Sequence, residues 1–403
     1  MKHLADSHTP LIAGLTDRPP TGIEALDAQR RRQLLSEISN GGTTRKRLAS
    51  LLRMRAGTVT QHVAELIDAG LVRELHQIRT NEKGRPEVLL SCATGAVKVI
   101  VVQAMADRIV ANLVDLEGTS SCEVFRPVRD PGIGGDDFRA LIIGLAGELR
   151  DRAGAGRLAG LVVSLPGIVD EAAGQWLFSS RFPNAAPLAF ASVGEALGMD
   201  VQVQRALNAE LRARLLRSYE GGADSTVLLH WGYGVGLTSA INGAVQHSAQ
   251  GGFGEIGHWR SFMAGEARCR CGETGCLETQ AALWSLVAPL HLPSSSEDEF
   301  ARYLSDDAAL SEHPLIRQAT TAMAIAMRDV YLLLFPNRIT ITGPFVQSPA
   351  IFERLVHEFH GNLPQYVPAN VAVEAAVLSP RDEIIGAAKP LLYQAMQKVL
   401  AGI

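Results

Sequence analysis

The sequence predicts an α/β protein with two parts, a small basic α+β head and a larger domain of alternating strands and helices. Residues 27–92 hold 12 Lys/Arg against 7 Asp/Glu, although the whole chain of 403 residues has a formal net charge of −4. After residue 92, apolar runs of strand length alternate with longer helical patterns, as in α/β domains. Within this second part, three of the five cysteines lie in eight residues, from 269 to 276.

Composition and length describe a globular protein. Apolar residues make up 47% of the chain, and 403 residues predict two or three domains of roughly 100–200 residues each. No stretch approaches the roughly 20 apolar residues of a membrane span, and the N-terminus lacks the apolar core and cleavage site of a signal peptide. We therefore expect a cytoplasmic location and no membrane partner. Residues 1–26 show no sustained apolar period and are predicted to be a flexible tail.

Residues 27–92 are predicted to form a winged helix-turn-helix domain. A helix begins at Asp27 and stops at 40–42 (Asn-Gly-Gly), a short helix follows around Leu48, and a third runs from about Gly57 to Ala69. Two short strands, 71–75 and 87–90, flank a hinge at 83–86. Three helices and a basic hairpin are the parts of this DNA-binding motif.

The head carries candidate contacts to double-stranded operator DNA. The third helix is expected to offer Thr58, Thr60, Gln61 and His62 to base edges. Cations expected to neutralise phosphates are Arg45, Lys46, Arg47, Arg53, Arg55 and, in the wing, Lys83 and Arg85. The alternative is a solvated basic face on a protein-binding module, but the run ELIDAGLVRE (65–74) followed by GRP (84–86) favours DNA.

Residues 93–403 are predicted to form an α/β domain with mixed sheets. Expected strands are 97–103, 109–116, 160–165, 201–204, 226–231 and 338–342, and expected helices are 137–153, 208–220 and 314–334. Strands separated by helices at this spacing indicate a layered domain in which helices cover the sheets.

The loop 254–279 has the composition of a metal site. Thiolate sulfur and imidazole nitrogen are the ligands that Zn²⁺ prefers, and one histidine with three cysteines completes a tetrahedron that leaves no position for water. The predicted ligands are His258, Cys269, Cys271 and Cys276. A closed site of this kind is structural, because a catalytic zinc needs an open position. The alternative is a disulfide with a spare thiol and a surface histidine, which a cytosolic location disfavours.

Several motifs together resemble the ROK family, named for repressors, open reading frames and sugar kinases. They are GEIGH and CRCGETGCLE in the zinc loop, LVVSLPGIVD (161–170), the glycine loop HWGYGVG (230–236) and PNRITITG (336–343), after an N-terminal winged helix. The resemblance covers about residues 27–403. It implies an actin- and hexokinase-like fold in which two α/β lobes enclose a ligand cleft.

Two features of the family's kinases are missing. The first hairpin of such kinases holds glycines that cradle phosphate, whereas this chain has Ala104, Met105 and Ala106 there. The family's catalytic aspartate aligns with Ala206, and alanine cannot abstract a proton. Only the second glycine loop, Gly232–Gly236, is present, and such a loop also serves as a tight turn. The chain is therefore predicted not to be an enzyme.

The resemblance also implies a sugar site. Its matching positions are Asn184, Glu255, His258 and Glu278, with His258 binding zinc through one ring nitrogen and a sugar hydroxyl through the other. Alternatively, Asn184 is a turn residue and the two glutamates are supporting or helix-capping carboxylates. Arg205 replaces a neutral residue next to the lost base, which favours the hypothesis of a phosphorylated or acidic sugar as effector.

The predicted function is a transcriptional regulator, acting as a repressor, that responds to a sugar or sugar derivative. We expect a homodimer or homotetramer, because two recognition helices on one face of DNA need paired heads. Two alternatives stay open: a sugar kinase that has kept a regulatory head, and a DNA-binding regulator that has lost sugar binding.

Overall fold

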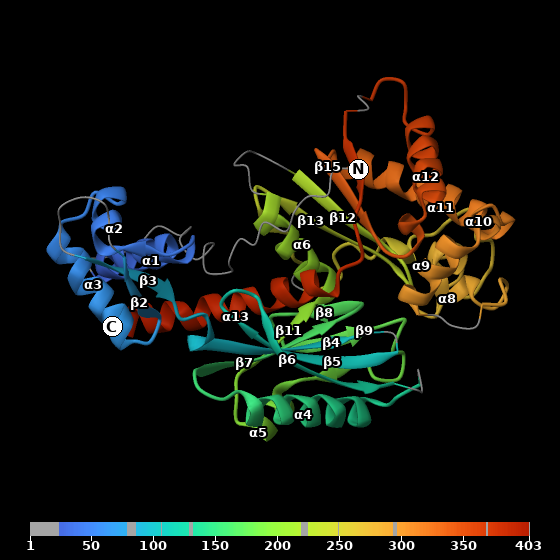
Figure 1. The fold of residues 1–403 in the computed structure, drawn as a ribbon. Helices are drawn as coiled ribbons and strands as arrows, with labels where there is room; N and C mark the ends of the chain where they lie inside the picture. The colour runs from blue at the N-terminus through green and yellow to red at the C-terminus, as the bar shows by residue number, and fades with distance from the viewer. Residues whose placement is uncertain are drawn as a thin grey trace.

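The computed structural model describes residues 24–78, 86–105, 107–128, 132–218, 225–248, 250–292, 296–367 and 370–402. It consists of a head and two α/β lobes in an elongated arrangement, with the head at one end (Figure 1). The predicted wing contacts Lys83 and Arg85, the hairpin residue Ala106 and residues 1–23 of the predicted tail fall outside the described ranges. Residues 24–26 of that tail begin the first helix.

The head has the fold of a winged helix-turn-helix. Its elements are α1 (Glu24–Ser39), β1 (Thr43–Thr44), α2 (Arg45–Leu51), α3 (Ala56–Asp68), β2 (Val72–Ile78) and β3 (Glu87–Cys92). The three strands form an antiparallel sheet in the order β1-β3-β2. Thr44 caps α2, because its hydroxyl accepts a hydrogen bond from the Arg47 amide at 3.3 Å. The predicted helices and strands are confirmed to within a few residues.

The N-terminal lobe is built on a five-stranded sheet in the order β11-β7-β4-β5-β6. Its elements are η2 (Thr94–Ala96), β4 (Val97–Ala104), β5 (Arg108–Asp115), β6 (Ser120–Pro127), α4 (Gly135–Arg152), β7 (Arg157–Leu165), α5 (Ala191–Leu197) and β11 (Val201–Arg205). A small sheet of β8 (Ile168–Asp170), β9 (Gln175–Phe178) and β10 (Leu188–Ala189) follows β7. Helix α4 covers one face of the main sheet, where Phe138 and Ile142 are fully buried.

The C-terminal lobe is built on a second five-stranded sheet in the order β14-β13-β12-β15-β16. Its strands are β12 (Ser225–Trp231), β13 (Val235–Ile241), β14 (Ala244–Val245), β15 (Arg338–Thr342) and β16 (Ala372–Ala375). The helices are η3 (Ile256–His258), α7 (Glu278–Ala281), α8 (Leu283–Leu286), α9 (Glu297–Asp306), α10 (Ala308–Ser311), α11 (Pro314–Leu334), η4 (Phe345–Gln347) and α12 (Pro349–Gly361). Together with the sheet they form the largest buried core of the described chain.

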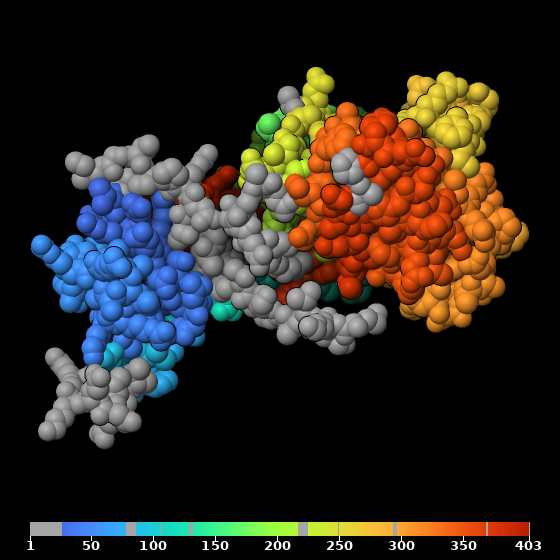
Figure 2. All heavy atoms as spheres, turned by 90° about the horizontal axis from the view of Figure 1, so that it is seen from above, coloured from blue at the N-terminus to red at the C-terminus, as the bar shows by residue number. Residues whose placement is uncertain are grey.

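Two helices lie between the lobes, α6 (Ala206–Ser218) and the C-terminal α13 (Pro380–Gly402). They cross so closely that a side chain at Gly386 would stand 1.7 Å from the Ala209 carbonyl oxygen, which only glycine permits. From this crossing α13 continues to the head, where Met396 and Leu400 join the buried core of α1 and α3 (Figure 1). In the view from above, the head and the C-terminal lobe occupy opposite ends of the molecule (Figure 2). One helix thus contacts α6, the sheet of the N-terminal lobe and the head.

No helix among the described residues combines the length and the apolar character that crossing a membrane requires.

Candidate functional site

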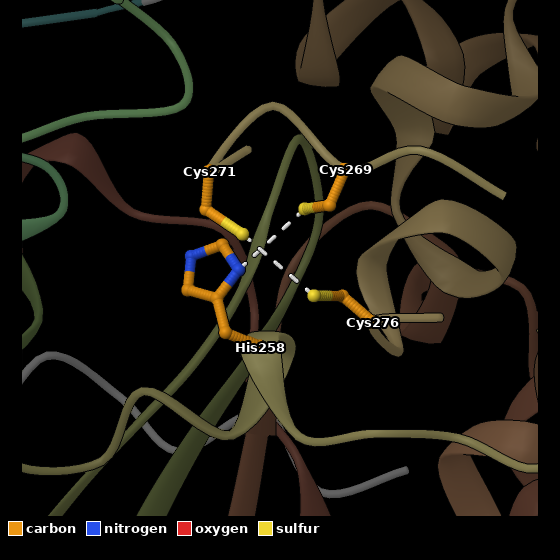
Figure 3. A group of neighbouring side chains, drawn as sticks. All are labelled: His258, Cys269, Cys271 and Cys276. Atoms are coloured by element: carbon orange, nitrogen blue, oxygen red, sulfur yellow. Dashed lines mark hydrogen bonds between the residues drawn. The ribbon is translucent and has the colours of Figure 1, made fainter. Parts of the chain in front are cut away.

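The four predicted metal ligands come together. His258 ends the short helix η3, and the cysteines lie on the turns that follow it, so that their side chains converge on one point (Figure 3). All four ligand atoms lie within 4.8 Å of one another. The His258 Nδ1 is 3.6 Å from the Cys269 Sγ, and the Cys271 and Cys276 sulfurs are 3.7 Å apart.

These distances fit a tetrahedral zinc ion. Zn–S bonds of about 2.3 Å separate two sulfurs by about 3.8 Å, and a Zn–N bond of about 2.0 Å puts the nitrogen about 3.5 Å from each sulfur. A disulfide would need an S–S distance of about 2.05 Å, and all five cysteines are free thiols. Burial raises the pKa of the Cys269 thiol to about 12, so a cation is needed to hold it as thiolate. The cluster therefore has the donors, spacing and electrostatics of a closed zinc site.

The zinc loop forms one wall of a cleft between the two lobes. The cavity has a volume of about 210 Å³ and is lined by residues from both lobes and from the start of α13. Four of the five predicted effector residues line it, namely Arg205, Glu255, His258 and Glu278. Ala104, Met105 and Ala206, which stand where a kinase would need glycines and a base, also line the cleft.

The prediction for Asn184 is wrong. This side chain is exposed, lies outside the cleft lining and donates a hydrogen bond to the Gly132 carbonyl at 3.1 Å. The segment turns after β9 so that Phe178, Ser179 and Arg181 face the cleft instead. The alternative of a turn residue describes Asn184 better, because the loop places it on the outer surface.

Arg205 lies in the cleft wall, but its guanidinium is committed to the protein itself. It donates to Glu255 Oε1 at 2.6 Å, and to the carbonyl oxygens of Leu237, Phe253 and Gly167 at 2.7, 2.9 and 3.2 Å. Only 6% of its side chain is exposed. The hypothesis that Arg205 offers its charge to an acidic or phosphorylated sugar is therefore not supported, because its donors already hold the Glu255 carboxylate and the surrounding backbone.

The Glu255 carboxylate has one oxygen to offer a ligand. Burial raises its pKa, and the charges of Arg205 and His258 oppose that rise. The second oxygen, Oε2, faces the His258 Nε2 at 4.0 Å, whereas the His258 Nδ1 points to the cysteines. A hydroxyl placed between them would donate to the carboxylate and accept from the imidazole N–H.

Glu278 is a buried carboxylate that is hydrogen-bonded to the cleft wall. It is 3% exposed, and its two oxygens accept hydrogen bonds from the Val235 amide at 2.9 Å and from the Trp284 indole at 3.1 Å. Those contacts fit the alternative of a supporting carboxylate, although Glu278 also lines the cleft.

A second polar cluster in the cleft was not predicted from the sequence. Glu297, in the first turn of α9, accepts hydrogen bonds from the Arg181 guanidinium at 2.7 Å and the Tyr233 amide at 2.7 Å, and lies 3.2 Å from the His230 Nε2. Burial disfavours its charge, but His230 and Arg181 outweigh this and hold the pKa of Glu297 well below its usual range. The same pairing raises the pKa of His230 despite burial. The acidic run at 297–299 was the available signal, but sequence cannot show which loop it meets.

In the head, the structure separates exposed from buried candidates. Thr60 and Gln61 are exposed on α3, and Thr58 is partly buried. Arg47, Arg53, Arg55 and Lys46 are exposed, and Lys46 also lies 3.4 Å from the Glu87 carboxylate. Arg45 is partly buried and pairs with Glu74 at 2.8 Å.

The prediction that His62 faces DNA is wrong. His62 is 2% exposed, with its Nδ1 2.8 Å from the Glu65 carboxylate and its Nε2 3.6 Å from Asp27. Its position explains this, because it is three residues after Val59 and four before Leu66, on the same apolar face of the helix. His62 therefore joins α3 to α1.

The fold and the cleft define a two-lobe, sugar-kinase-like protein that carries a winged helix-turn-helix head. The family model "ROK family" matches residues 133–393, and the chain belongs to that family. It is 27% identical over 369 residues to the DNA-binding transcriptional repressor Mlc of Escherichia coli (strain K12). The alignment covers 86% of this chain and 89% of Mlc.

Solved structures show the same fold. A ROK family transcriptional regulator, described as a homolog of the E. coli Mlc protein, matches with a TM-score of 0.69 and 22% identity over 93% of this chain and 98% of its own. The ROK hexokinase from Thermus thermophilus matches with a TM-score of 0.57 and 22% identity over 74% of this chain and 99% of its own. Fold alone therefore does not separate regulators from kinases.

Proposed function

We propose that this chain is a DNA-binding transcriptional regulator, acting as a repressor, whose affinity for DNA changes when a sugar binds in the interlobe cleft. The observation that carries the proposal is the course of α13. Pro380 and Glu383 at its start line the cleft, and the carbonyl of Leu400 near its end accepts a hydrogen bond from Arg31 of the head at 2.8 Å. A helix of 23 residues spans about 34 Å, so one element reaches from the cleft to the head.

The contact at the head leads directly to the recognition helix. Arg31 also donates to Glu65 of α3 at 2.8 Å, and Glu65 is bonded to His62 and Gln61. Burial opposes its ionisation, but its bonds to His62, Arg31 and Gln61 lower the pKa of Glu65 to about 2, so the carboxylate is charged at neutral pH. A shift of α13 relative to the lobes would therefore move α3, which is what differential binding to two conformations requires.

The head supplies the chemistry for DNA. In this proposal Thr60 and Gln61, which are exposed on α3, contact base edges, and the exposed Arg47, Arg53 and Arg55 contact phosphates. The name of the relative Mlc, a DNA-binding transcriptional repressor, supports the assignment. Operator DNA with two half-sites would engage two heads, and we propose a dimer or tetramer of identical chains.

The ion that we assign to the cysteine cluster is Zn²⁺ in a structural role. When bound, it would neutralise the thiolates and fix the turns between residues 258 and 276. His258 would then keep its Nε2 proton pointing at Glu255, so metal site and ligand site share one residue. This pair, set to bridge one hydroxyl, supports a sugar as the effector.

Phosphoryl transfer is disfavoured by the residues in the cleft. Ala206 stands at the position of the base, and Ala104 and Met105 occupy the first hairpin. Incubation with Mg-ATP and a panel of hexoses should give no phosphorylated sugar above background. Turnover of any hexose would revive the kinase alternative.

A mobility-shift titration with DNA from upstream of the chain's own gene tests the proposal. We expect binding that weakens as salt rises, because phosphate contacts release counterions. The absence of binding at low salt would refute the proposed function. A thermal-shift panel of sugars separates a responsive regulator from one without a sugar site, because a ligand of the folded state raises Tm.

A further inference from the structure

The glycine loop between β12 and β13 is filled by the protein's own carboxylates. The Tyr233 amide donates to Glu297 Oε1 at 2.7 Å, and the Val235 amide donates to Glu278 Oε1 at 2.9 Å. Backbone amides at consecutive turns of a glycine-rich loop are the usual cradle for phosphate oxygens. Here each of these two amides already has an anionic acceptor.

The glycines of this loop make room for those carboxylates. A Cβ at Gly232 would lie 2.6 Å from Glu297 Oε1, and one at Gly234 would lie 2.6 Å from Glu278 Oε1. Real Cβ atoms essentially never come this close, so a larger residue at either position would displace the carboxylate. The two glycines therefore let the internal anions approach the backbone of the loop.

The cations near the loop are committed in the same way. Glu297 takes the guanidinium of Arg181, whose side chain is 17% exposed, and lies within hydrogen-bond reach of the His230 imidazole. Arg205, the other arginine of the cleft wall, is held by Glu255 and three carbonyl oxygens. Among the described lining residues, seven carboxylates face two arginines and two histidines. An additional anion would enter a cleft whose two arginines already have anionic partners.

We propose that Glu297 is the specificity-determining residue of the cleft, a built-in anion that takes the amide, guanidinium and imidazole of a phosphate site and restricts the cleft to uncharged sugars. The inference rests on the proposed sugar cleft and names the class of its effector. It replaces the hypothesis of a phosphorylated or acidic sugar, which relied on Arg205 alone. In this proposal Glu255 and His258 bind the hydroxyls of the sugar, and no group of the cleft binds a phosphate.

The test removes the Glu297 carboxylate from the glycine loop by substitution and measures whether inorganic pyrophosphate then binds there. The variants are Glu297→Ala and Glu297→Gln in the full chain, with Glu299→Ala and Glu299→Gln as matched controls in the same turn of α9, outside the cleft lining. NMR of ring-labelled histidine reports on His230, so pyrophosphate bound to the basic head does not interfere. We expect no saturable shift in the wild type and in the Glu299 controls.

In Glu297→Ala, pyrophosphate should shift the His230 signal saturably, with an affinity at least about tenfold above the upper limit that the wild type sets, since a hydrogen bond to a charged group contributes about 1.5 kcal/mol or more. Glu297→Gln keeps the shape, loses the charge and should gain in the same direction. Circular dichroism and zinc content establish folding, and if the alanine variant does not fold, the glutamine variant decides. A wild type that already shows the His230 shift, or folded variants that show none, would overturn the proposal.

Calorimetry of the wild type with glucose, N-acetylglucosamine, xylose and the 6-phosphates of the first two addresses the effector directly. We expect any saturable heat to come from an unphosphorylated sugar. Tighter binding of a 6-phosphate would overturn the role of Glu297 and leave the DNA-binding proposal standing. Failure of the mobility shift, in contrast, would remove the proposed function without touching the pyrophosphate result.

Discussion

The cleft and the head use their arginines in opposite ways. In the cleft, Arg205 and Arg181 are mostly buried, and each is paired with a glutamate. In the head, Arg47, Arg53 and Arg55 are exposed on and beside α2 and α3. Cations held by internal partners organise a site for an uncharged ligand, whereas exposed cations suit a polyanion. The position of an arginine in the fold, rather than its presence in the sequence, decides which ligand it serves.

The zinc cluster gives the largest expected effect on the cleft. Cys271→Ser should abolish stoichiometric zinc and, because His258 loses its fixed orientation, sugar binding as well. Metal analysis after gel filtration and calorimetry measure the two. Cys122→Ser, at a free thiol outside the cluster, is the control and should keep both. A zinc-free Cys271→Ser variant that binds sugar normally would show that the loop does not organise the cleft.

Arg31 of the head contacts Leu400 near the end of α13, the helix whose first residues line the cleft. Arg31→Ala leaves the Glu65 carboxylate and the Leu400 carbonyl without this donor, and breaking a largely buried ion pair costs about 3–5 kcal/mol. We expect a lower Tm and a weakened effect of sugar on DNA affinity, with sugar affinity itself unchanged. Arg30→Ala, one residue earlier and 41% exposed, is the control. Full sugar response in folded Arg31→Ala would exclude this route.

Glu255→Gln sharpens the account of the cleft. The substitution removes the negative charge that faces both Arg205 and a ligand hydroxyl, and a hydrogen bond to a charged group contributes about 1.5–3 kcal/mol. Sugar affinity measured by calorimetry should fall by about 10- to 100-fold. Glu266→Gln, on the same loop but 81% exposed, should leave it unchanged. Equal sugar affinity in Glu255→Gln and Glu266→Gln would show that the sugar does not bind at Glu255.

Arg55→Gln tests whether an exposed arginine of the head contacts DNA phosphates. If Arg55 contacts phosphate, the slope of log K against log salt should decrease by about 1 with little change in sequence preference. The corresponding change at Arg205 should leave the slope unaltered, because that guanidinium is buried in the cleft. A salt slope that is unaffected at Arg55 would remove this residue from the DNA surface.

The pH dependence of His230 gives the smallest effect. Because Glu297 raises the pKa of His230, the charged pair stabilises the fold below the unfolded value of about 6.5, and this contribution is lost as pH rises through the folded pKa. NMR titration should place the His230 pKa above 6.5 in the wild type. In Glu297→Gln the largest opposition to burial is removed and only the weaker charge of Glu210 remains, so the pKa of His230 should fall relative to the wild type. An identical pKa in both proteins would mean that the pair does not couple.

Local sequence pattern predicted those parts of the molecule that depend on local chemistry. Helical periodicity located α3, and ligand type with spacing located the zinc cluster. The same periodicity contained the information that His62 is buried, since it shares a face with Val59 and Leu66. Reading every polar residue of α3 as exposed produced that error.

Contacts between distant segments could not be predicted. Glu297 meets the loop at Tyr233 across 64 positions of chain, and Arg31 meets Leu400 across 369. Helix α13 itself was not predicted, because it is buried against α6, the N-terminal lobe and the head, and it contains Pro390 and the closely packed Gly386. The hydrogen bonds of the Arg205 guanidinium could not be predicted either, because their carbonyl acceptors come from three separate segments of the chain.

Control of DNA binding by the cleft is tested by measuring DNA affinity and cleft occupancy together. Fluorescence anisotropy of the full chain with labelled DNA from upstream of its own gene would be recorded while an unphosphorylated sugar, chosen by thermal shift, is added. We predict that the Kd for DNA changes in one direction and saturates at the sugar concentration that saturates the cleft by calorimetry, as reciprocal linkage demands. A DNA affinity that stays constant while the sugar fills the cleft would contradict the account.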